Sequence, residues 1–175
     1  MNPTFQLAVL CALSVTVWGQ AGGSAVPRFE DFPAGAVFNG KPAPPRLVQA
    51  RDRAFRTRIR EGAANGPNFA GHFTIVEWGC GSTCVSIAVV DAKDGAIIHP
   101  VPFEILGWGM QMRYEDKYSL LQDRFRPLSY RTDSRLLTVR GCPEDENCAS
   151  YFYELTPDAK FKLIRKLRAV PVTPP

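Results

Sequence analysis

Four cysteines are the residues of this chain whose types and spacing offer the widest choice of chemistry. Cys80 and Cys84 lie in the stretch WGCGSTC, and Cys142 and Cys148 lie in GCPEDENC. Cysteines spaced in this way are compatible with a reactive thiolate, a four-sulfur zinc site or disulfide bonds. The neighbouring residues decide how well each of these chemistries fits.

Disulfide bonds fit the cysteines best. A reactive pair normally has the spacing C-x-x-C at the start of a helix, whereas three residues separate Cys80 from Cys84 and a strand-like run follows. Five residues between Cys142 and Cys148 fit a zinc knuckle poorly. A nucleophile elbow needs glycine two positions before and after the nucleophile, where Cys80 has Trp78 and Ser82.

The sequence therefore predicts four disulfide-bonded cysteines, Cys80, Cys84, Cys142 and Cys148. A cross-link over a long loop would contribute roughly 4 kcal/mol against roughly 2 kcal/mol for each short loop. Proximity nevertheless favours the local pairs, Cys80–Cys84 and Cys142–Cys148. The zinc and reactive-thiol interpretations stay open as alternatives.

The two histidines, His72 and His99, offer a second possible chemistry. In a strand, His72 would lie on the face opposite to Glu77, so these two side chains cannot form a dyad within that strand. We expect His72 to make one structural hydrogen bond. The enzymatic alternative is a small envelope hydrolase or thiol enzyme that uses His72 with Cys80 or with a distant carboxylate.

A segment rich in glycine, tryptophan and methionine is the first candidate binding element. Glycine permits motion, and Trp and Met side chains offer adaptable apolar contacts. The alternative is a loop that only covers the core. The candidate residues are Trp108, Met110, Met112 and Tyr114.

Arginines on a predicted helix over residues 46–61 are the second candidate. Val48, Phe55 and Ile59 have near-helical spacing, and Gly62 follows at the position of a helix C-cap. The arginines spread around the helix instead of forming one stripe, so a solvated face is the simpler interpretation. An anionic partner would contact Arg53, Arg56 and Arg60. The acidic loops DAKDG and PEDEN do not match a calcium-binding loop, and we predict neither a metal nor a cofactor.

The N-terminal residues predict export. The run Leu7–Trp18 has twelve uncharged residues, fewer than the roughly 20 that span a bilayer, and small-x-small cleavage sites end at Ala21 and Ala25. The chain has no Lys or Arg before Arg28, which is unusual for a signal peptide, and a buried N-terminal helix is the alternative. We predict a signal peptide over residues 1–21, with cleavage as late as 25, and a periplasmic or secreted protein with no transmembrane segment in the mature chain.

The remaining residues predict one domain of the α+β class, mainly β. Residues 26–45 are rich in Pro and Gly and predict an extended arm, and residues 46–175 predict a single domain. Short connections between apolar runs predict an antiparallel meander sheet of six or seven strands with one N-terminal amphipathic helix, stapled by disulfides. The runs lie at residues 71–78, 84–92, 96–101, 135–141, 149–155 and 161–167.

Two longer stretches, NFAGHFTIVEWGCGSTC and DSRLLTVRGCPEDENC, resemble a group of short exported bacterial proteins of unknown function that share a W-G-C-G-x-x-C motif. The resemblance implies export and an extracytoplasmic domain, and it implies no site. With a net charge of only +4 and no readout motif, a nucleic-acid partner is not expected. We expect a binding protein without catalytic activity, whose partner is an envelope component or another protein, as for an inhibitor or immunity factor.

Overall fold

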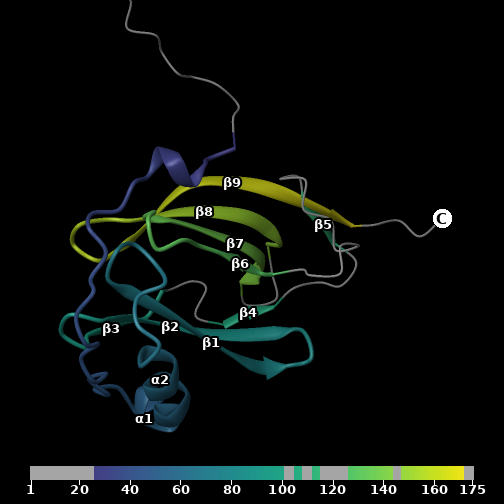
Figure 1. The fold of residues 1–175 in the computed structure, drawn as a ribbon. Helices are drawn as coiled ribbons and strands as arrows, with labels where there is room; N and C mark the ends of the chain where they lie inside the picture. Colours follow the sequence, from purple (N-terminus) through teal and green to yellow (C-terminus); the bar gives the residue numbers. More distant parts are fainter. Residues whose placement is uncertain (1–25, 101–104, 108–111, 115–125, 144–146, 172–175) are drawn as a thin grey trace, which may run out of the picture.

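An antiparallel β-sheet that folds over on itself forms the body of the protein (Figure 1). The computed structural model describes residues 26–100, 105–107, 112–114, 126–143 and 147–171. Within these residues the sheet has nine strands in the order β1-β2-β4-β7-β8-β9-β5, with β3 beside β2 and β6 beside β7. The strands are β1 (Phe73–Gly81), β2 (Cys84–Asp91), β3 (Ile97–Ile98), β4 (Ile105–Gly107), β5 (Met112–Tyr114), β6 (Leu128–Ser129), β7 (Leu136–Pro143), β8 (Ala149–Leu155) and β9 (Phe161–Pro171).

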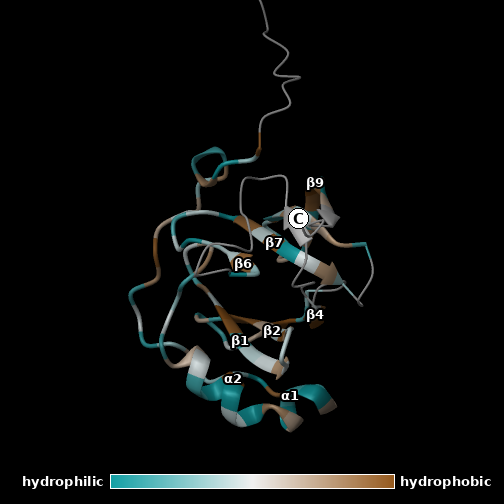
Figure 2. Cartoon of the chain, turned by 90° about the vertical axis from the view of Figure 1, so that its right-hand side faces the viewer, coloured by the Kyte–Doolittle hydropathy of each residue, from teal (hydrophilic) through white to brown (hydrophobic). Residues whose placement is uncertain are grey.

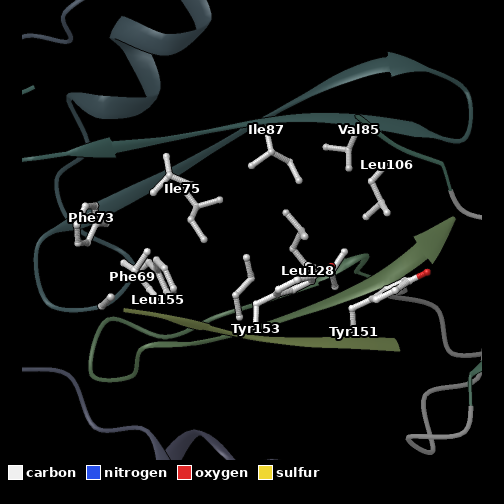
Figure 3. Packing of buried hydrophobic residues seen from close by; sticks show 14 of the residues in the cluster. Phe69, Phe73, Ile75, Val85, Ile87, Leu106, Leu128, Tyr151, Tyr153 and Leu155 are labelled. Carbon is white, nitrogen blue, oxygen red and sulfur yellow. The ribbon is translucent and has the colours of Figure 1, made fainter. Parts of the chain in front are cut away.

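The main core lies between the two halves of the folded sheet. Alternate residues of a strand point to the same face, and in β1 and β2 this places Ile75 and Ile87 opposite the β8 residues Tyr153 and Leu155 (Figure 3). The side chains in this core are almost completely buried, and Leu106 of β4 joins them. Burial of these alternating apolar faces holds the two layers together.

The outer face of β1 and β2 is covered by helices. In place of the single helix predicted over residues 46–61, the structure has two short helices, α1 (Ala50–Ala54) and α2 (Arg56–Ala63). Phe55 interrupts them, and its ring lies 5.0 Å from the ring of Trp78. Both helices are mainly hydrophilic, whereas β2 is hydrophobic (Figure 2). A second apolar cluster fills the contact between α2 and the strands: Ile59, Ala63, Val76, Trp78, Ala88 and Val90.

Gly62 has a different role from the helix C-cap that its position predicts. It lies inside α2, and Ala64 is the C-cap residue. A Cβ atom at Gly62 would lie 2.4 Å from Cγ1 of Val76 and 2.8 Å from its Cγ2. The missing side chain therefore lets α2 approach β1 closely.

The predicted meander is correct for the hairpins and incomplete elsewhere. β1 pairs with β2, and β7, β8 and β9 follow one another as antiparallel neighbours. Between these hairpins, β4 links β2 to β7, and β5 pairs with the end of β9. The strand count exceeds six or seven because β4, β5 and β6 are too short to show an alternating pattern.

The N-terminal arm crosses both layers. Its backbone N–H groups donate hydrogen bonds from Ala34 to Asp133, from Phe38 to Gly71 and from Ala43 to Ala92. A short 3-10 helix, η1 (Phe29–Asp31), begins this path. The arm thus ties the residues just before β7 to those just before β1 and just after β2.

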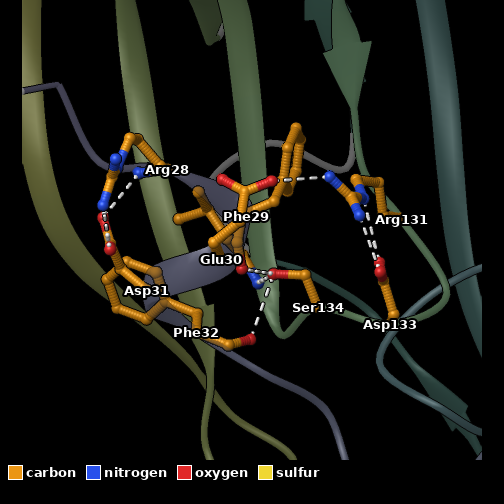
Figure 4. Close-up of polar contacts among 9 residues, drawn as sticks. Arg28, Phe29, Glu30, Asp31, Phe32, Arg131, Asp133 and Ser134 are labelled. Carbon is orange, nitrogen blue, oxygen red and sulfur yellow. Dashed lines mark hydrogen bonds and ion pairs between the residues drawn. The ribbon is translucent and has the colours of Figure 1, made fainter.

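Polar contacts fix η1 to the turn before β7 (Figure 4). Arg131 joins Glu30 at 2.8 Å and Asp133 at 2.7 Å. The hydroxyl of Ser134 lies 2.8 Å from the carbonyl oxygen of Phe29 and 3.0 Å from that of Phe32. Ser134 is 1% exposed, so these carbonyl groups provide the partners that a buried hydroxyl needs.

Candidate binding surface

The four cysteines form the two local disulfides, Cys80–Cys84 and Cys142–Cys148. The disulfide prediction is therefore confirmed. Because each of the four sulfurs is bonded to its partner in one of these two disulfides, they form neither a reactive thiolate nor a four-sulfur zinc site. In the part of the chain that the structure describes, no group of three or more His, Cys, Asp or Glu side chains is placed to hold a metal ion.

The two disulfides lie at the same end of the sheet. Cys84 of β2 is paired with Gly107 of β4, and Gly107 is paired in turn with Cys142 of β7. The two disulfides therefore fix the ends of β2 and β7, which lie on either side of Gly107. The predicted binding residues Trp108 and Met110 follow directly in the chain, outside the described residues.

His72 has an acidic neighbour that the sequence analysis did not identify. Its Nε2 lies 3.5 Å from Oδ2 of Asp91. Asp91 is paired with Phe73 in the β1–β2 register, so pairing the two predicted strands as a hairpin would have placed it beside His72. Burial lowers the pKa of His72, and the nearby Asp91 carboxylate opposes that shift.

The enzymatic alternative that joins His72 to Cys80 is not supported by this geometry. Cys80 lies eight residues further along the chain, a separation of about 26 Å at about 3.3 Å per strand residue. Its sulfur is also bonded to Cys84. His72 and Cys80 therefore cannot act together.

The other histidine, His99, belongs to the buried interior. Its Nε2 lies 2.8 Å from Oδ1 of Asp52, and the two side chains are 9% and 2% exposed. The other carboxylate oxygen of Asp52 accepts a hydrogen bond from the backbone N–H of Gln49 at 2.8 Å. Asp52 therefore caps the start of α1 and joins this helix to the residues that follow β3.

The remaining predicted binding residues do not form one site. Met112 and Tyr114 lie in β5, whose backbone pairs with β9, and their side chains are outside the described residues. Arg53, Arg56 and Arg60 are exposed on the helices, on the opposite side of the molecule from β9 (Figure 1).

A basic surface that the sequence analysis missed lies along β9. The stretch KFKLIRKLR, residues 160–168, has five basic residues and no acidic one. Leu163 and Ile164 are 48% and 37% exposed, which is high for aliphatic side chains. We call the exposed members of this strand the β9 surface: Lys162, Leu163, Ile164, Lys166 and Arg168.

The β9 surface adjoins a part of the sheet edge that no other described strand covers. β8 pairs with one side of β9, and β5 pairs with the other side only between Ala169 and Pro171. Among the residues that the structure describes, no strand pairs with Phe161–Arg168 on that second side. A β-bulge interrupts the β8 register near Ile164.

A shallow pocket widens the β9 surface at its C-terminal end. It has a volume of about 460 Å³, and the described residues that line it are Asn147, Cys148, Lys166 and Arg168. The Nζ of Lys166 lies 5.1 Å from the centre of the Tyr151 ring, which holds this cation beside the pocket. The C-terminal end of the β9 surface therefore lies next to the Cys142–Cys148 disulfide.

One signal in the sequence was available for this surface. Five cations in nine residues without an acidic residue are unusual for a strand of a protein whose total charge is only +4. The apolar residues of this stretch alone predict only a strand.

In comparisons with known proteins, no family model, no curated protein and no solved structure matches this chain. Within the described residues, no helix is long and apolar enough to span a membrane.

Proposed function

We propose that this chain is an exported, non-catalytic binding protein that captures an acidic, extended segment of a partner protein at the β9 surface. The observation that carries the proposal is a stretch of β9 that no described strand pairs with on one side, and whose exposed residues are cationic and aliphatic. Disulfide bonds are compatible with a periplasmic or extracellular location. The apolar leader over residues 1–21 and the resemblance to exported W-G-C-G-x-x-C proteins support the same compartment.

Strand addition is a recognised way for a sheet edge to bind a peptide. The peptide backbone pairs with the unpaired N–H and C=O groups, and its side chains give specificity. In this protein, β5 already pairs with the same side of β9 at Ala169–Pro171. A partner segment would extend this pairing along Phe161–Arg168.

The charge of β9 selects between possible partners. A second copy of the chain would bring Lys162, Lys166 and Arg168 against the same cations, and like charges placed opposite each other are unfavourable. An acidic segment would place carboxylates beside them. The surface therefore favours an acidic partner over self-association.

Aliphatic side chains supply the apolar part of the contact. Leu163 and Ile164 expose about half and about a third of their surface, and a bound segment would remove part of that surface from water. The cations would chiefly set the rate of association and the choice of partner. An acidic segment with alternating aliphatic residues matches both features.

The test uses synthetic peptides and fluorescence anisotropy. A labelled peptide with alternating Glu and Val should bind, whereas the same peptide with proline at its central positions should bind at least about tenfold more weakly, because proline removes ladder hydrogen bonds. A Lys/Val peptide should not bind. Equal binding of the proline peptide would contradict strand addition.

Charge reversal identifies the surface that binds. The triple variant Lys162→Glu, Lys166→Glu and Arg168→Glu should weaken binding of the Glu/Val peptide at least about tenfold. The matched control, Arg53→Glu, Arg56→Glu and Arg60→Glu, makes the same change of charge on the helices and should change binding less than about twofold. Loss of binding only in the helix variant would overturn the proposed surface.

An anionic lipid or polymer of the envelope is the competing partner. It would use the same cations without pairing with the strand backbone. Binding to phosphatidylglycerol vesicles together with no binding of the Glu/Val peptide would replace the protein partner with an envelope component.

A further inference from the structure

A second pocket lies where the arm crosses from one layer of the sheet to the other. It has a volume of about 400 Å³, within the range of small-molecule sites. Residues from the arm, from the start of β1, from the β2–β3 turn and from the β8–β9 turn line it. None of these residues belongs to the β9 surface.

The lining of this pocket is mainly apolar. Ala70, Phe73, Leu155 and Pro157 supply hydrocarbon and ring surface. Phe73 and Leu155 are 6% and 2% exposed, so their positions are fixed by the core. A compact apolar group would therefore find a preformed place against them.

The charges around the pocket leave one cation available. Arg135 is paired with Glu154, and Asp91 is close to His72. The exposed Lys93 also lines the pocket, and its ammonium makes no ion pair with any residue that the structure describes. The other acid of the β2–β3 turn, Asp94, is paired with Arg46 at 2.9 Å.

His72 adds a polar group beside Lys93. Its side chain is 26% exposed and lines the same pocket. Because burial lowers its pKa, the neutral imidazole is the main form near pH 7. A neutral imidazole can donate or accept a hydrogen bond without attracting a second anion.

We propose that this pocket binds a small organic acid, with its carboxylate on Lys93 and a ring-sized apolar body against Phe73 and Leu155. The pocket combines an apolar interior with a few convergent polar groups, which is the usual composition of a small-molecule site. This activity is separate from the capture of a peptide at β9, so either can fail without the other.

The chain offers a variant that blocks the pocket and a matched control. Gly35 lines the pocket, and a Cβ atom built there meets nothing within 4 Å. Gly79 is equally open at its Cβ position but does not line the pocket. The Cβ atom of Gly35→Leu therefore fits without a clash, and the rest of the side chain should obstruct the pocket; Gly79→Leu makes the same change elsewhere.

The test is ligand-observed NMR and titration calorimetry with benzoate, phenylacetate and cyclohexanecarboxylate, and with benzamide as the neutral control. At least one acid should bind with a dissociation constant below about 1 mM, and benzamide should bind at least about tenfold more weakly. Lys93→Met should reduce binding of the acid about tenfold, and Gly35→Leu should abolish it. Gly79→Leu should leave it unchanged.

Three results would overturn the proposal. The first is that none of the three acids binds at about 10 mM, an affinity too weak for a built site. The second is that Gly35→Leu binds the acid as tightly as Gly79→Leu does. The third is that benzamide binds as tightly as benzoate, which would remove the role of Lys93.

Discussion

The two edges of the sheet, at β1 and at β9, differ in how the described residues cover them. At the β1 end, the side-chain amide of Asn68 takes the place of a neighbouring strand: Nδ2 donates to the carbonyl of Ile75 at 3.0 Å, and the N–H of Ile75 donates to Oδ1 at 2.7 Å. The backbone of Asn68 and Phe69 also pairs with Phe73. At the β9 end, the described residues contain no such cover for Phe161–Arg168.

This difference shows two ways of protecting a sheet edge from pairing with other chains. An uncovered edge pairs readily with other chains unless it is shielded or carries charge. β1 is buried on both faces from Phe73 to Val76. Asn68 covers its edge there, and the helices cover one of its faces. β9 carries lysine and arginine instead. Such charges disfavour pairing with other chains, and in the function that we propose they also select an acidic partner.

The largest expected loss of stability comes from detaching the helices that pack on β1. Asp52→Ala should lower the free energy of unfolding by about 2–4 kcal/mol, because the variant loses the cap of α1 and leaves buried His99 without its carboxylate. Urea denaturation followed by circular dichroism measures this change. Asp52→Asn keeps an oxygen acceptor and should cost less; an Ala variant as stable as the parent chain would contradict the role of this contact.

Removing the Asn68 amide should open the β1 edge. Asn68→Ala should lower the free energy of unfolding by about 2 kcal/mol, because the N–H and C=O groups of Ile75 lose their partners. The exposed edge should also make the sedimentation coefficient increase with protein concentration. Asn68→Asp retains the acceptor and should give an intermediate stability. A variant that stays monomeric at all concentrations would show that Asn68 does not prevent edge pairing.

A smaller change tests the close contact between α2 and β1. Gly62→Ala should lower the free energy of unfolding by about 1–2 kcal/mol, because crowding against Val76 outweighs the better helix propensity of alanine. In the background of Val76→Ala, the same Gly62→Ala substitution should cost much less. An equal cost in both backgrounds, measured by urea denaturation, would exclude this contact as the cause.

The smallest expected effect on stability is at β9. Replacement of Lys162, Lys166 and Arg168 by Gln should change the free energy of unfolding by less than about 0.5 kcal/mol per site, as is usual for exposed side chains. Lys166 is the member expected nearest that limit, since it lies over the Tyr151 ring. A loss above about 1 kcal/mol at any site would mean that β9 charge serves the fold instead of recognition.

Local sequence patterns predicted much of the fold. The turn residues between Asp91 and Ala96 and the short connection between β8 and β9 specify hairpins, and the disulfides pair cysteines only four and six residues apart. The long strands β1, β2, β7 and β8 show continuous or alternating apolar residues. In these elements the deciding interactions are close in sequence.

Other features depend on contacts between residues that are distant in sequence. Asp91 lies beside His72 only because of the β1–β2 register, and Asp52 meets His99 across 47 positions of the chain. Gly62 resembles a helix end until Val76 is seen to lie under it. The candidate surface depends on the strand order. Among the described residues, KFKLIRKLR pairs with β8 on one side, and β5 reaches only the last residues of β9 on the other.

Hydrogen–deuterium exchange with and without saturating Glu/Val peptide tests the central claim most directly. If β9 is the docking edge, added protection will be confined to backbone amides of Phe161–Arg168, and the β1 edge near Ile75 will not change. Protection confined to the helices around Arg53 and Arg60, or no protection while the peptide is bound, would contradict strand addition at β9.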